Sequence, residues 1–142
     1  MIRLEWYRLP SFNVSSRLLK VKGKVLIFSE CLVVEHPEIL DNYSKDYVML
    51  GVCMEENMFN VVSLKIASML TRVKLNELVV LTVDGSPHCV QLHHAVEEAR
   101  KISGEANIVH MVEHDGKVFT VSSKVVKTSR YLYKISRILG ES

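Results

Sequence analysis

Short apolar runs alternate with amphipathic segments along most of this chain. Three runs are apolar enough and short enough to be buried strands, at residues 25–28, 47–52 and 78–83. Apolar residues at helical spacing follow the second run, over residues 57–73, and the third, over residues 87–103. Strands of this kind that alternate with helices predict a parallel sheet covered by helices on both faces.

Weaker patterns fill the rest of the first half of the chain. We expect a strand at 2–7 that ends at Pro10, and a short helix at 15–23. The strand at 25–28 is predicted to continue through residues 32–34, and residues 37–41 to form one helical turn. The helix at 57–73, capped by Asn57, carries apolar residues around much of its circumference, so we expect it to be well buried.

The second half adds a hairpin. A strand is predicted at 107–112, and Asp115-Gly116 is a strong turn signal before a returning strand at 118–121. A final helix should begin at Ser122 or Ser123 and end at Gly140. The prediction is a single α/β domain over residues 1–142. It has three layers, a mostly parallel sheet that resembles flavodoxin and Rossmann folds, and an antiparallel hairpin at one edge.

Composition fits this picture and limits the environment. The chain has 142 residues, of which 48% are hydrophobic and 24% charged, with a net charge of +2. No stretch approaches the roughly 20 apolar residues of a membrane span, and the first residues lack the apolar run of a signal peptide. The odd number of cysteines, 3, and their wide spacing argue against a secreted disulfide framework. We therefore expect a protein of the reducing cytoplasm.

The most informative stretch is the junction between the strand at 78–83 and the helix that follows. Asp84-Gly85 turns the chain, Ser86 is a good N-cap, and proline suits the next position because it lacks an N–H. Cys89 then lies in the first turn, where the helix dipole favours a thiolate. His88 should stay neutral there and is able to act as a base or ligand. Cys89 and His88 are the candidate catalytic residues.

The three cysteines share a position relative to the predicted strands. Cys31, Cys53 and Cys89 each follow one of the three buried strands, so a parallel sheet would place all of them at its carboxyl edge. Thiolates there suit zinc or an iron–sulfur cluster, and His93, four residues after Cys89, is a further candidate ligand. The alternative is three buried structural cysteines, which the absence of any C-x-x-C pair favours.

The same turn offers a phosphate site. Backbone N–H groups at Gly85 and Ser86, at the start of a helix, are able to bind a phosphate. The turn has one glycine and lacks the dinucleotide and nucleoside triphosphate fingerprints, and Asp84 adds a negative charge. A well-capped connection without a ligand is the competing interpretation.

The end of the chain is basic. Lys127, Arg130, Lys134 and Arg137 recur at helical spacing, opposite an apolar face that we expect to pack on the sheet: Val125, Leu132, Ile135 and Leu139. The stripe is able to bind an acidic partner, but the balanced total charge and the lack of a nucleic-acid-binding motif argue against nucleic acid.

Three functional hypotheses follow. The first is a small cytoplasmic accessory protein, redox- or metal-associated and possibly iron–sulfur, which works at the carboxyl edge of the sheet and has a protein partner in a redox complex. The second is a module that binds a phosphate-bearing small molecule at residues 84–89. The third is a non-enzymatic subunit that docks through its C-terminal helix. No membrane is predicted to take part, and enzymatic activity is left open.

Overall fold

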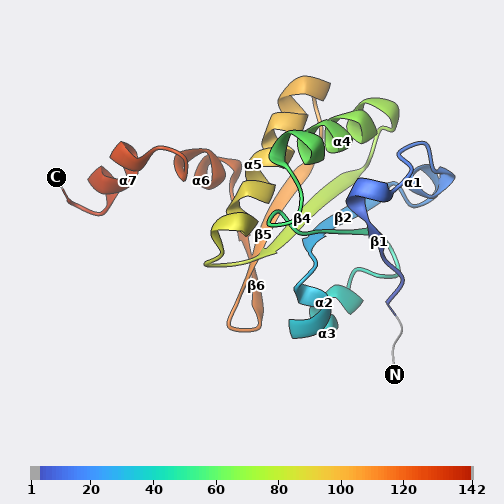
Figure 1. Ribbon diagram of the computed structural model, residues 1–142, viewed down its shortest axis with the longest axis horizontal. Helices are drawn as coiled ribbons and strands as arrows, with labels where there is room; N and C mark the ends of the chain where they lie inside the picture. Colours follow the sequence, from blue (N-terminus) through green and yellow to red (C-terminus); the bar gives the residue numbers. More distant parts are fainter. Residues whose placement is uncertain (1–3, 142) are drawn as a thin grey trace.

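A six-stranded sheet forms the centre of the molecule (Figure 1). The computed structural model describes residues 4–141. The strand order is β1-β3-β2-β4-β5-β6, and every neighbouring pair is parallel except β5 and β6. The strands are β1 (Tyr7–Arg8), β2 (Lys24–Ser29), β3 (Val48–Val52), β4 (Glu77–Val83), β5 (Ile108–His114) and β6 (Lys117–Val121).

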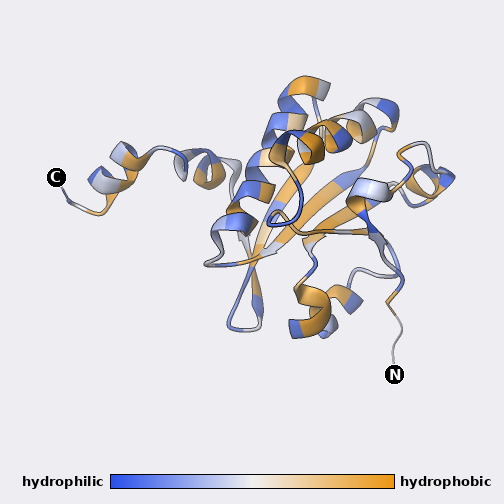
Figure 2. Cartoon of the chain, in the orientation of Figure 1, coloured by the Kyte–Doolittle hydropathy of each residue, from blue (hydrophilic) through white to orange (hydrophobic). Residues whose placement is uncertain are grey.

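Helices cover both faces of this sheet. On one face, α4 (Phe59–Arg72) and α5 (Pro87–Ser103) pack on Val25, Leu50 and Val80, together with α1 (Arg17–Lys22). On the other face, α2 (Leu32–Glu35) and α3 (Pro37–Asp41) pack against the strand residues of opposite parity. The central strands are hydrophobic through most of their length, as buried parallel strands require (Figure 2). The predicted three-layer α/β fold is confirmed.

The path of the chain creates a topological switch point. From β2 the chain moves to β3 on one side, and from β3 it crosses back over β2 to β4 on the other side. The segments that leave the carboxyl ends of the neighbouring strands β2 and β4 therefore run to opposite sides, and a crevice forms between them. Crevices of this kind are where open α/β sheets bind their ligands.

The junction between β4 and α5 forms as its residues predict. Ser86 Oγ accepts a hydrogen bond from the Cys89 N–H at 3.3 Å, and Pro87 is the first helical residue. The helix ends before Gly104, which has a φ of 100°. At the predicted hairpin, Asp115 and Gly116 have φ values of 51° and 78°, which suits a two-residue turn between twisted strands.

Two predicted strands in the first half are wrong in extent. Residues 32–34 do not prolong β2 but begin α2, because the Cys31 carbonyl accepts a hydrogen bond from the Glu35 N–H at 3.0 Å. At the start of the chain only β1 pairs with the sheet, and the short helix η1 (Leu9–Ser11) follows it at once. Residues 2 and 3 of the predicted opening strand lie outside the described residues.

Helix α4 is less buried than its composition predicts. Its N-cap is Met58, since the Asn57 side chain instead donates to the Cys53 carbonyl at 2.8 Å. Met58, Val61 and Leu64 are exposed, because the helix presents one face to the sheet and no second layer covers the other. None of the helices within residues 4–141 combines the length and the apolarity needed to cross a bilayer.

The C-terminal segment forms two short helices, not the single helix predicted. Helix α6 (Ser123–Thr128) lies beside α5, and α7 (Leu132–Ile138) extends away from the sheet (Figure 1). Ser129 Oγ donates to the Val126 carbonyl at 2.6 Å, a local hydrogen bond that competes with continuation of the helix. The predicted packing of the apolar face on the sheet is wrong: Val126 is buried, while Leu132 and Leu139 are exposed.

Candidate functional site

All three cysteines line one small cavity at the carboxyl edge of the sheet. The cavity has a volume of about 140 Å³ and lies where β3, β2 and β4 end. Cys31 follows β2, Cys53 follows β3, and Cys89 follows β4. The cavity therefore spans the switch point between β2 and β4, the position at which a ligand site is expected in this type of sheet.

Local backbone structure fixes each cysteine at the start of a helical turn. The Cys31 carbonyl accepts from the N–H groups of Val34 and Glu35 at the beginning of α2. The Cys53 carbonyl accepts from the N–H groups of Glu56 and Asn57. Cys89 lies in the capped first turn of α5. Three separate turns thus hold the sulfur-bearing residues in place around one space.

The sulfur atoms have polar and charged neighbours. Cys89 Sγ lies 3.0 Å from Ser29 Oγ at the end of β2, a hydrogen bond in which either atom is able to donate. Burial, followed by the negative charges of Cys89 and Glu35, raises the pKa of Cys31 to about 11. The charge of Cys53 adds to this effect. Cys89 and Cys53 are therefore close enough to Cys31 to affect the ionisation of its thiol.

Other groups complete the lining of the cavity. His88 and Glu55 are exposed at its rim, Glu30 is half-buried, and Met54 is buried. Cys31 is itself exposed, whereas Cys53 and Cys89 are half-buried, so the cavity opens to solvent. Among the residues that the structure describes, no three side chains of His, Cys, Asp or Glu are already arranged as the ligands of a metal ion.

The phosphate candidates lie on the same turn. Ser86 lines the cavity, but its hydroxyl is engaged by the Cys89 N–H. Gly85 has a φ of 93° and nothing within 4 Å of the position that a Cβ would take. Asp84 forms an ion pair with His114 at 3.4 Å, which keeps a carboxylate next to the turn.

His93, the fourth candidate metal ligand, lies apart from the thiol cavity. Its side chain is buried, and both of its ring nitrogens have partners. Nε2 lies 2.7 Å from Thr82 Oγ1, and Nδ1 lies 2.9 Å from Nδ1 of His110. A nitrogen already engaged in this way is not available as a metal ligand, so the structure does not bring His93 into the set.

Thr82, His93, His110 and Glu97 form a buried polar chain, which we call the histidine network. His110 Nε2 lies 2.7 Å from Glu97 Oε2, and Arg100 donates to Glu97 Oε1, also at 2.7 Å. Burial opposes ionisation of Glu97, but hydrogen bonds from Arg100 and His110 outweigh it and keep the pKa of this carboxyl below its usual value.

One arrangement of protons satisfies every member of the histidine network. The Thr82 hydroxyl donates to His93 Nε2, His93 Nδ1–H donates to His110 Nδ1, and His110 Nε2–H donates to the Glu97 carboxylate. His93 is neutral in this arrangement. Burial is the largest of the causes that lower the pKa of His93 to about 3, which agrees with a neutral ring.

The low pKa of His93 predicts acid sensitivity. The unfolded chain takes up a proton at His93 near pH 6.5, whereas the folded chain resists protonation down to about pH 3. The free energy of unfolding should therefore fall as the pH drops through this window. Urea unfolding of the natural protein and of His93→Gln, compared at pH 7.5 and pH 5, measures the contribution, and the variant should lose less stability. Equal losses in the two proteins would contradict the neutral assignment.

The sequence interpretation missed the histidine network. Two features of the sequence hint at this network. His93 and Glu97 are four residues apart, so they lie on the same face of a helix. Thr82 and His110 are polar residues within two otherwise apolar strands. The pairing of β4 with β5 that brings His110 beneath α5 is not visible in the sequence.

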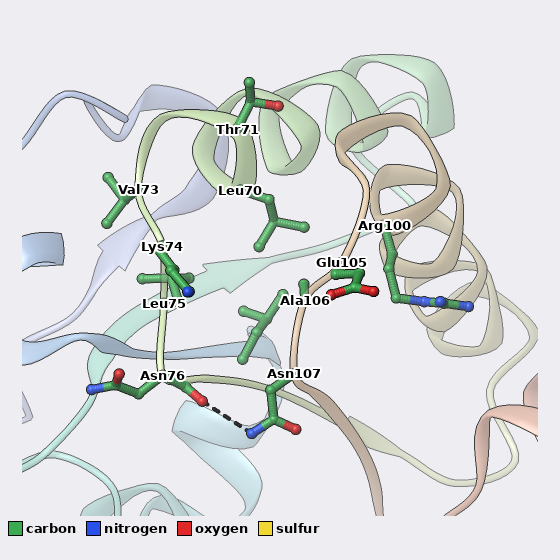
Figure 3. Close-up of a pocket in the computed structure, with 11 residues that line it drawn as sticks. Leu70, Thr71, Val73, Lys74, Leu75, Asn76, Arg100, Glu105, Ala106 and Asn107 are labelled. Carbon is green, nitrogen blue, oxygen red and sulfur yellow. Dashed lines mark hydrogen bonds between the residues drawn. The ribbon is translucent and has the colours of Figure 1, made fainter.

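A larger cavity lies at the opposite edge of the sheet (Figure 3). Its volume is about 720 Å³, and it lies where β4 and β5 begin. Asn107 Nδ2 donates to the Asn76 carbonyl at 3.0 Å across it, and Lys74, Arg100 and Glu105 are its charged residues. Its lining residues include no cysteine or histidine. Open α/β sheets bind their ligands at the carboxyl ends of the strands, whereas this cavity lies at the amino ends of β4 and β5. Its size alone therefore does not make it the functional site.

Comparison with known families found one family model that covers most of the chain. The family model of the Rossmann-like domain matches residues 18–139, which include every strand from β2 to β6. Comparisons with curated proteins and with solved structures gave no significant match. With this match over most of its length, the chain belongs to the Rossmann-like domain family.

Proposed function

We propose that Cys31, Cys53 and Cys89 bind a thiophilic metal ion or an iron–sulfur cluster, and that the protein is a redox- or metal-associated accessory protein of the reducing cytoplasm. The observation that carries this proposal is the convergence of all 3 cysteines of the chain on one cavity. Cysteines that serve only to fill the core would not need to lie together at the switch point of the sheet.

The electrostatics of the cavity support a cation. Burial, and after it the negative charges of Cys89 and Glu35, raises the pKa of Cys31, so a thiolate at this position is unfavourable without a cation beside it. A bound metal ion neutralises these charges and stabilises the thiolates, so binding should release protons. The Ser29 hydroxyl would then donate to the Cys89 thiolate and hold its sulfur in position.

Formation of the site requires side-chain rotation but no change of fold. The backbone of each cysteine is fixed by its own turn, and exposed or half-buried thiols are free to change rotamer. Three thiolates leave one position of a tetrahedral ion open. His88 or Glu55, both at the rim, is able to supply a fourth ligand or to act as a base beside a bound water.

Zinc titration with thiol counting tests the proposal. Protein purified anaerobically and stripped with a chelator should bind zinc with release of protons, and the bound zinc should protect all 3 cysteines from alkylation. Reconstitution with iron and sulfide, followed by visible spectroscopy, distinguishes a cluster from a single ion. Full alkylation at saturating zinc, together with failure to take up iron, would contradict the proposal.

A further inference from the structure

A second cavity, of about 470 Å³, lies between α5 and the C-terminal helices. We call it the basic cleft. It is lined by six cationic side chains: Arg100, Lys101, Lys124, Lys127, Arg130 and Lys134. They come from the second half of α5, from α6, from the turn after α6 and from α7. Figure 1 shows α6 beside α5.

The positive charge of the basic cleft is only partly balanced. Glu97 pairs with Arg100 at 2.7 Å, and Glu98 is shared between Lys101 at 3.4 Å and Arg130 at 3.6 Å. The remaining three cationic residues form no ion pair within residues 4–141: Lys124, Lys127 and Lys134. Like charges gathered in a cavity attract an anion, whose binding relieves their repulsion.

Helix α6 is docked in a way that builds the cleft. Val126 is buried beneath it, and Ser129 Oγ lies 3.1 Å from Nε2 of His94. Ser123 Oγ donates to Glu97 at 3.5 Å, which joins α6 to the histidine network. These contacts hold α6 against α5, so the backbone positions that carry the cationic side chains of α6 are fixed relative to α5.

We propose that the basic cleft binds a small molecule that carries several phosphate groups, of the size of a nucleotide. Arginine and lysine together are the usual partners of phosphate oxygens, and the hydroxyl of Thr128 adds a donor to the lining. The volume lies within the range of about 300–1,000 Å³ that is typical of small-molecule sites. This inference is independent of the proposed metal site.

Two features favour a small molecule over a nucleic acid strand. The cationic groups surround a cavity, whereas a strand needs a basic track that continues along the surface. Tyr131 lies at the cleft with Lys134 Nζ 4.8 Å from the centre of its ring, so a single aromatic group is available to stack on one base.

Calorimetry at low salt tests the proposal, with ATP and inorganic tripolyphosphate as probes. The triple variant Lys124→Gln/Lys127→Gln/Lys134→Gln removes three exposed charges and should weaken binding about 100-fold, because each charge-assisted hydrogen bond makes a substantial contribution. The matched control is Lys20→Gln/Lys45→Gln/Lys74→Gln, which makes the same change in net charge at exposed lysines elsewhere. The control should bind as the natural protein does.

A second readout comes from His94, which lines the cleft. Burial and the positive charge of Arg130 lower the pKa of this imidazole, so a bound anion should raise it in an NMR titration. Three results would overturn the proposal: no binding of either probe at low salt, equal weakening by the two triple variants, or tight binding of a short single-stranded DNA that ATP does not displace.

Discussion

Replacement of Cys89 with serine should weaken zinc binding by about 100-fold or more. Loss of even an outer partner of a metal ligand costs roughly 10–100-fold in affinity, and the loss of a ligand should cost at least as much. Serine nearly preserves the size of the side chain but supplies a hard, protonated oxygen in place of a soft thiolate. Cys31→Ser and Cys53→Ser should behave alike, since the account gives the three thiolates the same role. Competition of each variant with a chromophoric chelator measures the affinity.

The control for these variants is Met49→Leu. It removes a buried sulfur from β3. The Met49 side chain packs with α2 and α3, on the face of the sheet opposite to α4 and α5. The change conserves volume and should leave zinc binding unchanged. Zinc affinity that survives all three single cysteine replacements would show that the thiols are not the metal ligands.

Replacement of His110 with alanine should lower the free energy of unfolding by about 3–5 kcal/mol. His110 is 1% exposed and stands between His93 and Glu97 in the histidine network. Removal of the His110 ring leaves the Nδ1–H of His93 without an acceptor. It also removes the donor to Glu97 Oε2, and it opens a cavity in the core. Urea unfolding at pH 7.5, where His93 is neutral, measures the loss.

His114→Ala provides the comparison on the same strand. His114 is exposed, and replacement of exposed residues changes stability by less than about 0.5 kcal/mol. A loss below about 1 kcal/mol for His110→Ala would indicate that water reaches the histidine network and satisfies its groups, contrary to the burial described.

Local sequence patterns predicted the elements that local interactions determine. The α5 helix begins and ends as predicted because Ser86, Pro87 and Gly104 act on the backbone of their own turn. The convergence of the cysteines was also predictable, since each one follows an apolar strand and parallel strands share a carboxyl edge. The order of the strands, and with it the switch point, depends on pairing between distant segments and was not.

Long-range packing explains the predictions that were wrong. The pattern of Leu132 and Leu139 is that of an amphipathic helix, but whether such a helix rests on the sheet depends on whether a free face remains for it. In this fold α4 and α5 already cover that face. The residues around His93 in the sequence likewise do not indicate whether it binds a metal or belongs to a buried network. Its partner His110 is brought next to it by the pairing of β4 with β5.

X-ray absorption spectroscopy of the zinc-loaded protein determines how many sulfur atoms bind the metal. We expect three sulfur atoms at about 2.3 Å from zinc, because Cys31, Cys53 and Cys89 together supply the ligands. A first shell with nitrogen and oxygen alone, or with a single sulfur, would contradict it.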